Sequence, residues 1–191
     1  MPIRNAARSL TLAALTLFVF TAPFAAPLAA QAGGDMKPDA KPLPSPAATA
    51  ETLLGSGRVT ITYNSPAMRG RAIMGGVVPY GQVWRTGANP ATTIVATTDL
   101  MIGPLAVPAG TYTLYTLPGK SDWLLIVNQQ TGQWGTEYSQ AKDLGRVPMK
   151  ATPMTSPQEH MTITFEHTSG SSTQLHVRWE TTDRYVTITA K

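Results

Sequence analysis

The segment from Arg69 to Thr92, which reads RGRAIMGGVVPYGQVWRTGANPAT, contains the densest group of side chains suited to bind a ligand. The forked guanidinium groups of Arg71 and Arg85 match the two oxygens of a carboxylate or phosphate. Asn89 offers one acceptor and two N–H donors, and the indole of Trp84 can stack on a sugar or on a guanidinium. Together these residues predict a small site for an anion or a carbohydrate.

The same segment also has a purely structural interpretation. Its glycines and prolines favour turns, and turns hold side chains in fixed positions. Buried arginine and asparagine side chains often bond to loop carbonyl and amide groups that would otherwise cost about 1–3 kcal/mol each. Arg71, Arg85 and Asn89 would then hold a structural corner rather than a ligand, and the sequence leaves both interpretations open.

A second candidate lies in the segment from Gly132 to Tyr138, GQWGTEY. Trp134 stands between two glycines, so its side chain has room to project. With Tyr138 it would form a stacking platform for a glycan. The alternative is that Trp134 is tucked into one end of the domain as a plug, which is the commoner position of a large aromatic side chain.

The usual catalytic motifs are lacking. The sequence contains no cysteine, no G-x-S-x-G nucleophile elbow, no H-E-x-x-H zinc motif and no phosphate-binding P-loop. A hydrolase of an envelope saccharide or ester stays open as an alternative, with Glu137, Asp143 or Asp122 as catalytic carboxylates and Arg85 as an anion clamp. Because glycosidase carboxylates must lie about 5–9.5 Å apart in space, we assign no catalytic residue from sequence.

The three histidines fall late in the chain, outside both candidate loops. If Glu166 faces Gln174 across the final hairpin, then Glu166 and His176 are diagonal neighbours and His160 faces Glu180. Two such ligands are fewer than the three that a catalytic zinc needs, so we predict no metal and no cofactor. These side chains are instead expected on a solvated polar face of the sheet.

Short strands must position the candidate residues. Apolar and polar side chains alternate in several segments, which indicates half-buried strands. The clearest cover residues 59–63, 92–98, 111–117, 122–128, 161–165, 175–179 and 185–189. A turn after Leu117 predicts a hairpin, and Pro148 places residues 144–150 at a sheet edge or a bulge. Eight or nine strands without a helix predict an all-β fold, a jelly-roll-like antiparallel β-sandwich.

The N-terminal residues indicate export. Arg4 and Arg8 precede the apolar run Leu10 to Phe20, and Ala30-Gln31-Ala32 offers a cleavage site. This order of features predicts a signal peptide over residues 1–32 and a periplasmic or secreted protein. The apolar run is shorter than the roughly 20 residues of a membrane span, so no span is expected after cleavage.

The rest of the chain divides into two parts. Prolines alternate with small or polar residues in 33–50, which predicts an extended linker, and residues 51–191 have the length of a single domain. The chain has 15 Lys and Arg against 11 Asp and Glu; without the two leader arginines the balance is 13 against 11, or +2. So small a charge without a basic run argues against nucleic acid as a partner.

Several segments together resemble the exported bacterial family known as domain of unknown function 2911. The resemblance is carried by VPYGQVWRTGANPATT (78–93), LAVPAGTYTLYTLPG (105–119), DWLLIVN (122–128), QWGTEY (133–138) and LHVRWETTDRYV (175–186). It implies a secreted or periplasmic β-rich domain and supplies no catalytic residue. The positions that match its signature are Gly70, Arg71, Trp84, Arg85, Gly87, Asn89, Gly110, Tyr112 and Trp134.

We therefore predict a non-catalytic exported domain that binds through the loops 71–89 and 132–138. The candidate partners are a glycan, a small anionic ligand or an envelope protein, and the candidate ligand-binding residues are Arg71, Trp84, Arg85, Asn89, Trp134 and Tyr138. The alternatives are the carboxylate hydrolase described above and a structural domain without a site in these loops.

Overall fold

The computed structural model of the protein describes residues 44–191. The predicted signal peptide lies outside the described residues, as does the linker up to residue 43. The described part contains the strands β1 (Ala47–Leu54), β2 (Gly57–Asn64), β3 (Thr92–Ala96), β4 (Leu100–Ile102), β5 (Leu105–Val107), β6 (Gly110–Pro118), β7 (Trp123–Asn128), β8 (Asp143–Thr152), β9 (Gln158–Ser169), β10 (Ser172–Glu180) and β11 (Thr182–Ala190), and the 3-10 helix η1 (Gln140–Lys142). No helix among these residues is long and apolar enough to cross a bilayer.

All strands belong to one antiparallel sheet in the order β1-β2-β3-β6-β7-β8-β11-β10-β9, with the small β4–β5 hairpin attached to β11. The predicted all-β antiparallel class is confirmed. Residues 44–191 contain eleven strands instead of eight or nine, and these strands form one sheet and not the two sheets of a sandwich. The reason lies in β8, whose first part pairs with β7 while its last residues, 150–152, pair with β11. Alternation within a strand does not reveal such a change of partner.

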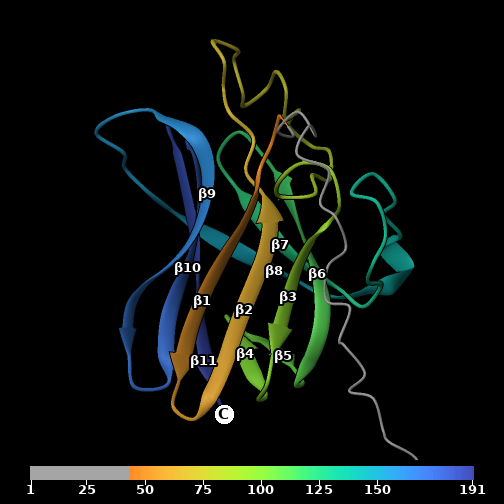
Figure 1. The fold of residues 1–191 in the computed structure, drawn as a ribbon, viewed down its shortest axis with the longest axis vertical. Helices are drawn as coiled ribbons and strands as arrows, with labels where there is room; N and C mark the ends of the chain where they lie inside the picture. The colour runs from red at the N-terminus through yellow and green to blue at the C-terminus, as the bar shows by residue number, and fades with distance from the viewer. Residues whose placement is uncertain (1–43) are drawn as a thin grey trace, which may run out of the picture. The chain divides into compact units, whose positions relative to one another are not determined.

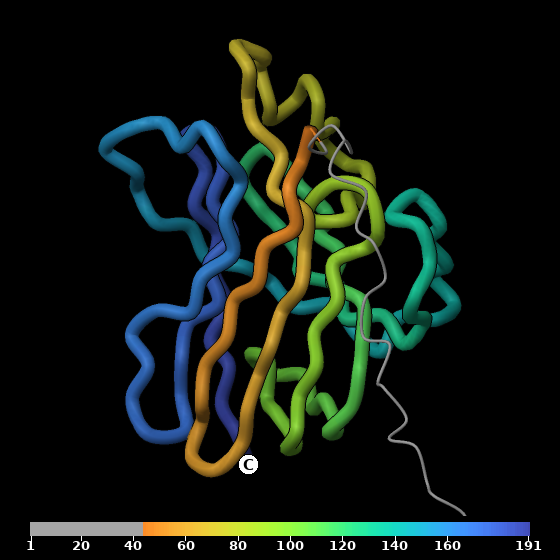
Figure 2. Tube along the Cα trace, viewed as in Figure 1, coloured from red at the N-terminus to blue at the C-terminus, as the bar shows by residue number. Residues whose placement is uncertain are grey.

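The sheet curls until its two edge strands, β1 and β9, approach each other (Figures 1 and 2). In the turn after β1, Gly55 N donates to Gly170 O at 3.1 Å. In the chain after β2, Pro66 O accepts from Met161 N of β9 at 2.9 Å. Between these points the two edges do not pair as a ladder. The result is a barrel-like sheet that is nearly closed.

The inside of this curled sheet holds the hydrophobic core. Val59, Ile61 and Tyr63 of β2 are buried, while the polar residues between them are more exposed. The largest core side chains come from strands all around the sheet and include Ile94, Leu114, Leu125, Met161 and Trp179. The burial of apolar surface stabilises a fold by about 25 cal/mol per Å². The alternating pattern gives the sheet one apolar face, and burying that face stabilises the curled sheet.

Strand β1 begins at Ala47, inside the segment 33–50 that composition indicated as linker. It pairs with β2 along its whole length, from Ala47 opposite Asn64 to Leu54 opposite Gly57. Alanine is depleted in strands, and these small side chains hide the alternation, so residues 47–50 carry no strong strand signal. The extended linker therefore ends before the composition suggested.

The predicted hairpin of residues 111–117 and 122–128 is confirmed as β6 and β7, which pair from Thr113 opposite Asn128 to Pro118 opposite Trp123. The prediction that Pro148 marks an edge or a bulge is wrong on the β7 side. Pro148 lies opposite Leu124 in a regular ladder, and the register shift falls at Val127 and Asn128 instead. On the other side of β8, pairing with β11 begins only at Lys150, so the missing N–H of Pro148 interrupts no ladder there.

Two long connections meet at the sheet and carry the candidate residues. The loop 65–91 joins β2 to β3, and the loop 129–142 joins β7 to β8. Single bridges tie them down: Trp84 pairs with Thr116 of β6, and Pro90 pairs with Trp134 of the other loop. The first loop projects from one end of the sheet, and the β1–β2 turn lies at the other end (Figure 1).

Candidate functional site

Two adjoining cavities lie where the loops meet, and they share Val77, Trp84 and Arg85 as a common wall. The first cavity has a volume of about 250 Å³. The second has a volume of about 200 Å³. Besides the common wall, the first is lined by Pro79, Gln82, Val83, Tyr115, Gly135, Thr136 and Tyr138, and the second by Ser45, Pro66, Arg71, Gly87, Ala88 and Trp179.

The walls of both cavities carry positive charge without an acid. Arg71 and Arg85 are lining residues, and no Asp or Glu of residues 44–191 lines either cavity. Fixed cations in a partly enclosed space attract anions more strongly than the same cations in open water, because the effective dielectric constant is lower. The electrostatics of the two cavities therefore favour an anionic occupant.

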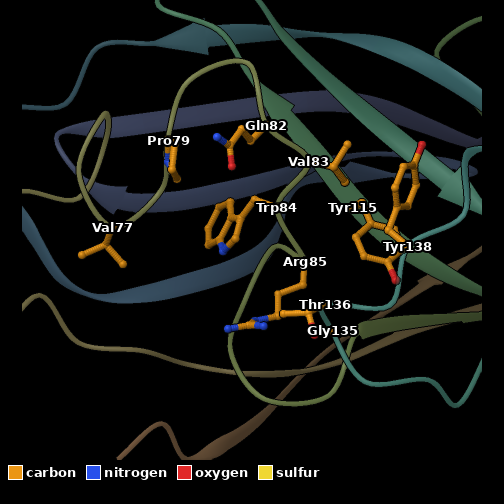
Figure 3. A pocket seen from close by; sticks show the side chains of 10 residues that line it. All are labelled: Val77, Pro79, Gln82, Val83, Trp84, Arg85, Tyr115, Gly135, Thr136 and Tyr138. Atoms are coloured by element: carbon orange, nitrogen blue, oxygen red, sulfur yellow. The ribbon is translucent and has the colours of Figure 1, made fainter.

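Arg85 carries a charge without a hydrogen-bond or ion-pair partner among residues 44–191. Its side chain is half-buried. The Nε atom is covered and unpaired, and Arg85 lines both cavities. Figure 3 shows this guanidinium extended below Trp84, away from Tyr115 and Tyr138. Its donors are free for an acceptor that enters from solvent.

Backbone contacts set the course of the Arg85 side chain. The backbone N–H and C=O groups of Trp84 each form a hydrogen bond of 2.8 Å with the backbone of Thr116. These bonds hold Trp84, the residue before Arg85, against β6. Gly135 lies directly under the Arg85 stem, because a Cβ atom at Gly135 would be 2.1 Å from Arg85 Cδ and 2.6 Å from Asn89 O. Only glycine lets the two loops approach this closely, so Gly135 allows the Arg85 stem to lie against the loop 129–142.

Arg71 and Asn89 differ from Arg85. Arg71 donates from Nε to Met68 O at 2.9 Å and from Nη2 to Ala67 O at 2.8 Å, so it holds its own turn while it lines the second cavity. These bonds are of the kind that the structural interpretation expects, and the place in the cavity wall is what the binding interpretation expects. Asn89 lines neither cavity; it has a φ of 60°, and its buried Nδ2 has no partner. Asparagine tolerates this left-handed conformation, so the backbone here favours this residue type.

Trp84 belongs partly to the core and partly to the cavity walls. Its indole stacks on Trp179 at a centroid distance of 5.8 Å and meets the edge of Trp123 at 6.4 Å. Its Nε1 donates to Gly87 O at 3.1 Å. These contacts hold the ring in one orientation. Trp179, which the sequence presented only as a strand residue, lines the second cavity behind it.

The two residues of the predicted platform lie in different environments: Trp134 is exposed to solvent, and Tyr138 lines the first cavity. Trp134 is 50% exposed and lines neither cavity, so it is not a plug in the core. Tyr138 lines the first cavity, meets Tyr115 edge-on at 5.0 Å, and donates its hydroxyl to Asp143 at 2.7 Å. Burial, followed by the bond to Asp143, raises the pKa of Tyr138 to about 12. The structure therefore gives Tyr138, but not Trp134, a place at the cavities.

The carboxylates considered for a hydrolase do not line either cavity. Asp143 accepts hydrogen bonds from Asn128 at 2.8 Å, Tyr138 at 2.7 Å and Arg146 at 2.9 Å, which makes it an anchor for the loop 129–142. Glu137 is exposed on this loop, and Asp122 is exposed at the β6–β7 turn.

The comparison with family models decides what the chain is related to. The model described as Protein of unknown function (DUF2911) matches residues 45–188, which is most of the chain and nearly all of the described part. The chain belongs to the DUF2911 family. No curated protein and no solved structure matches it. The resemblance to domain of unknown function 2911 is confirmed. The description of this family names no activity.

A second polar cluster of this DUF2911 domain lies on the outer face of β9, β10 and β11. His176 is 2% exposed and Asp183 is 3% exposed, and His176 Nδ1 lies 2.8 Å from Asp183 Oδ1. Arg178 donates from Nε to the other oxygen of Asp183 at 2.8 Å and also pairs with Glu166. The expectation that His176 is solvated is wrong, because Tyr185 stacks on its ring at 5.0 Å and the neighbouring charges cover its edges.

The predicted register of these strands is partly correct. Glu166 does face Gln174, and His176 Nε2 lies 3.9 Å from the Glu166 carboxylate. His160 does not face Glu180, because the register shifts between Arg178 and Glu180. The Glu180 carboxylate instead accepts the backbone N–H groups of loop 65–91, at Ile73 and Met74. Within residues 44–191 no group of three or more His, Asp or Glu side chains is placed to hold a metal ion.

Glu166 makes the stability of this DUF2911 domain depend on pH. The hydrogen bonds from Arg178 lower its pKa from 4.5 to about 2. A carboxylate with a lowered folded pKa stabilises the fold above its unfolded pKa, and this contribution is lost as the pH falls toward 2. The difference in pKa corresponds to at most about 3 kcal/mol, reduced by solvent screening because the Glu166 side chain is 30% exposed.

We expect the free energy of unfolding, measured with urea, to fall between pH 5 and pH 2. In Glu166→Gln this fall should be smaller, whereas the exposed Glu51→Gln should follow the wild type. An unchanged fall in Glu166→Gln would show that other carboxylates dominate the acid response.

Proposed function

We propose that this chain is an exported, non-catalytic binding domain whose loops 71–89 and 132–138 hold a small anionic ligand. The observation that carries the proposal is Arg85, a half-buried cation without an internal acceptor that lines both cavities. Leaving a partly buried charge without a partner is costly, and proteins pair or hydrate such charges. An anion in the cavities would supply the missing acceptor.

Two further observations support this proposal. Arg71 lines the second cavity together with Arg85, and neither cavity contains a competing acid among residues 44–191. The volumes of about 250 and 200 Å³ lie below the roughly 300–1,000 Å³ of sites for drug-sized ligands. A small ligand is therefore favoured over a long chain. The export part of the proposal rests on the leader sequence.

The proposal is tested by titrating the purified protein with sodium sulfate and sodium acetate. The readout is the indole N–H signal of Trp84 in a proton–nitrogen NMR spectrum, because its Nε1 bonds to Gly87 in the wall of the second cavity. A hydrogen bond to a charged group contributes about 1.5–3 kcal/mol. We therefore expect Arg85→Gln to weaken anion binding at least tenfold.

Arg58→Gln is the matched control. It removes the same charge from β2, near the β1–β2 turn, where Arg58 pairs with Glu51 on the surface. Binding should be unchanged in this variant. Equal weakening in both variants would mean that the anions respond only to net charge, and no shift of the Trp84 signal with either salt would refute the proposal.

A further inference from the structure

We infer that the ligand is a sugar acid, with its carboxylate between Arg71 and Arg85 in the second cavity and its ring in the first. This inference rests on the proposed function and makes it more specific. The two cavities share only Val77, Trp84 and Arg85, and they differ in chemistry on either side of that wall. A ligand that occupies both must therefore have two chemically different parts.

The second cavity suits the charged part. Both arginines line it, and Arg71 is already held in place by its bonds to Met68 O and Ala67 O. A cation with a fixed position loses little freedom when an anion binds. Arg85, with its free guanidinium, completes a pair of donors for a planar carboxylate, which guanidinium groups bind through two parallel hydrogen bonds.

The first cavity suits an uncharged ring with hydroxyl groups. Gln82 and Thr136 line it and form no side-chain hydrogen bond with any residue of 44–191. An amide and a hydroxyl can each donate to and accept from a sugar hydroxyl. Figure 3 shows Gln82 above the Trp84 indole, on the side away from Arg85. This places the free amide of Gln82 beside an aromatic surface, a combination that sugars bind, while Thr136 lies on the Arg85 side of the cavity.

The two tyrosines limit the choice of ring. Tyr115 donates its hydroxyl to Glu137 O and accepts from Gln133, and Tyr138 bonds to Asp143 and Arg146. Their hydroxyls are engaged, so they contribute apolar surface and shape to the first cavity. The polar recognition must come from Gln82 and Thr136. Both residues are exposed to water in the free protein. The hydroxyl groups of a sugar acid can replace that water as partners, whereas an aromatic carboxylate offers no hydroxyl group to do so.

The experiment compares sodium glucuronate with three probes that each lack one part: acetate has no ring, glucose has no charge, and benzoate has no hydroxyl groups. Binding is followed by the indole N–H signal of Trp84 and by calorimetry where affinity permits. We expect glucuronate to bind at least tenfold more tightly than each of the three. Gln82→Ala should weaken glucuronate about threefold to tenfold and leave acetate unchanged.

Gln129→Ala, an exposed glutamine that lines neither cavity, is the matched control and should change nothing. Acetate or benzoate binding as tightly as glucuronate would overturn the sugar-acid inference and leave anion binding in place. Glucose binding as tightly as glucuronate would overturn the role of the arginines. Absence of binding by acetate, benzoate and glucuronate would overturn both this inference and the proposed function.

Discussion

Replacing Asp183 by alanine is expected to lower the free energy of unfolding by about 3–5 kcal/mol, the largest loss that a single charged side chain of the described residues should cause. The Asp183 carboxylate is buried and links His176 at 2.8 Å to Arg178 at 2.8 Å. Removing it leaves a buried imidazole and a partly buried guanidinium short of an acceptor. The loss is measured by urea unfolding at pH 7, followed by tryptophan fluorescence.

The control is Glu51→Ala, which removes a carboxylate from an exposed ion pair whose partners keep 51% and 45% of their surface. Exposed pairs contribute about 0–1 kcal/mol, so this variant should lose less than about 1 kcal/mol. Asp183→Asn keeps the shape of the side chain and separates charge from packing. A loss below about 1 kcal/mol in Asp183→Ala would show that the cluster on β9 to β11 does not stabilise the fold.

The fold class was predictable because it depends on local alternation. Residues such as Val59, Ile61 and Tyr63 alternate with polar neighbours, and the hairpin of β6 and β7 followed from its turn. The sheet order was not predictable, since the change of partner within β8 is a long-range event that leaves no local mark. The same holds for β1, whose small side chains hide its pattern.

The candidate site was predictable in part. The chemistry of Arg71, Trp84 and Arg85 identified three residues that do line the second cavity together. Sequence could not separate Arg85, which has no internal acceptor, from Arg71, which bonds to its own turn. Trp179 was missed because a buried strand tryptophan looks like any core residue.

The burial of His176 was missed for a related reason. Its position next to Glu166 was foreseen from the register, but the cover over its ring comes from Tyr185 on the next strand and from the charges that meet there. Such cover depends on three strands at once. The alternation in a strand therefore predicts on which face of the sheet a polar residue lies. It does not predict whether solvent reaches that face.

Replacing Gly135 by alanine is expected to lower the free energy of unfolding by about 2–3 kcal/mol and to abolish anion binding. The new Cβ would lie 2.1 Å from Arg85 Cδ, which can move, and 2.6 Å from Asn89 O, which belongs to the backbone bridge between the loops. Overpacking of this kind costs about 1–3 kcal/mol, and the backbone contact places the change at the upper end. Urea unfolding and acetate titration measure the two effects.

Gly132→Ala is the control in the same loop, since nothing lies within 4 Å of its Cβ position and only its φ of 78° opposes the change. It should lose about 1–2 kcal/mol from the left-handed backbone and keep anion binding. The double variant Gly135→Ala with Arg85→Ala should regain part of the lost stability, because the closest contact, to Arg85 Cδ, is gone, and still fail to bind. If Gly135→Ala bound acetate like the wild type, the position of the Arg85 guanidinium would not depend on Gly135, and the geometry from which the anion site is argued would be wrong.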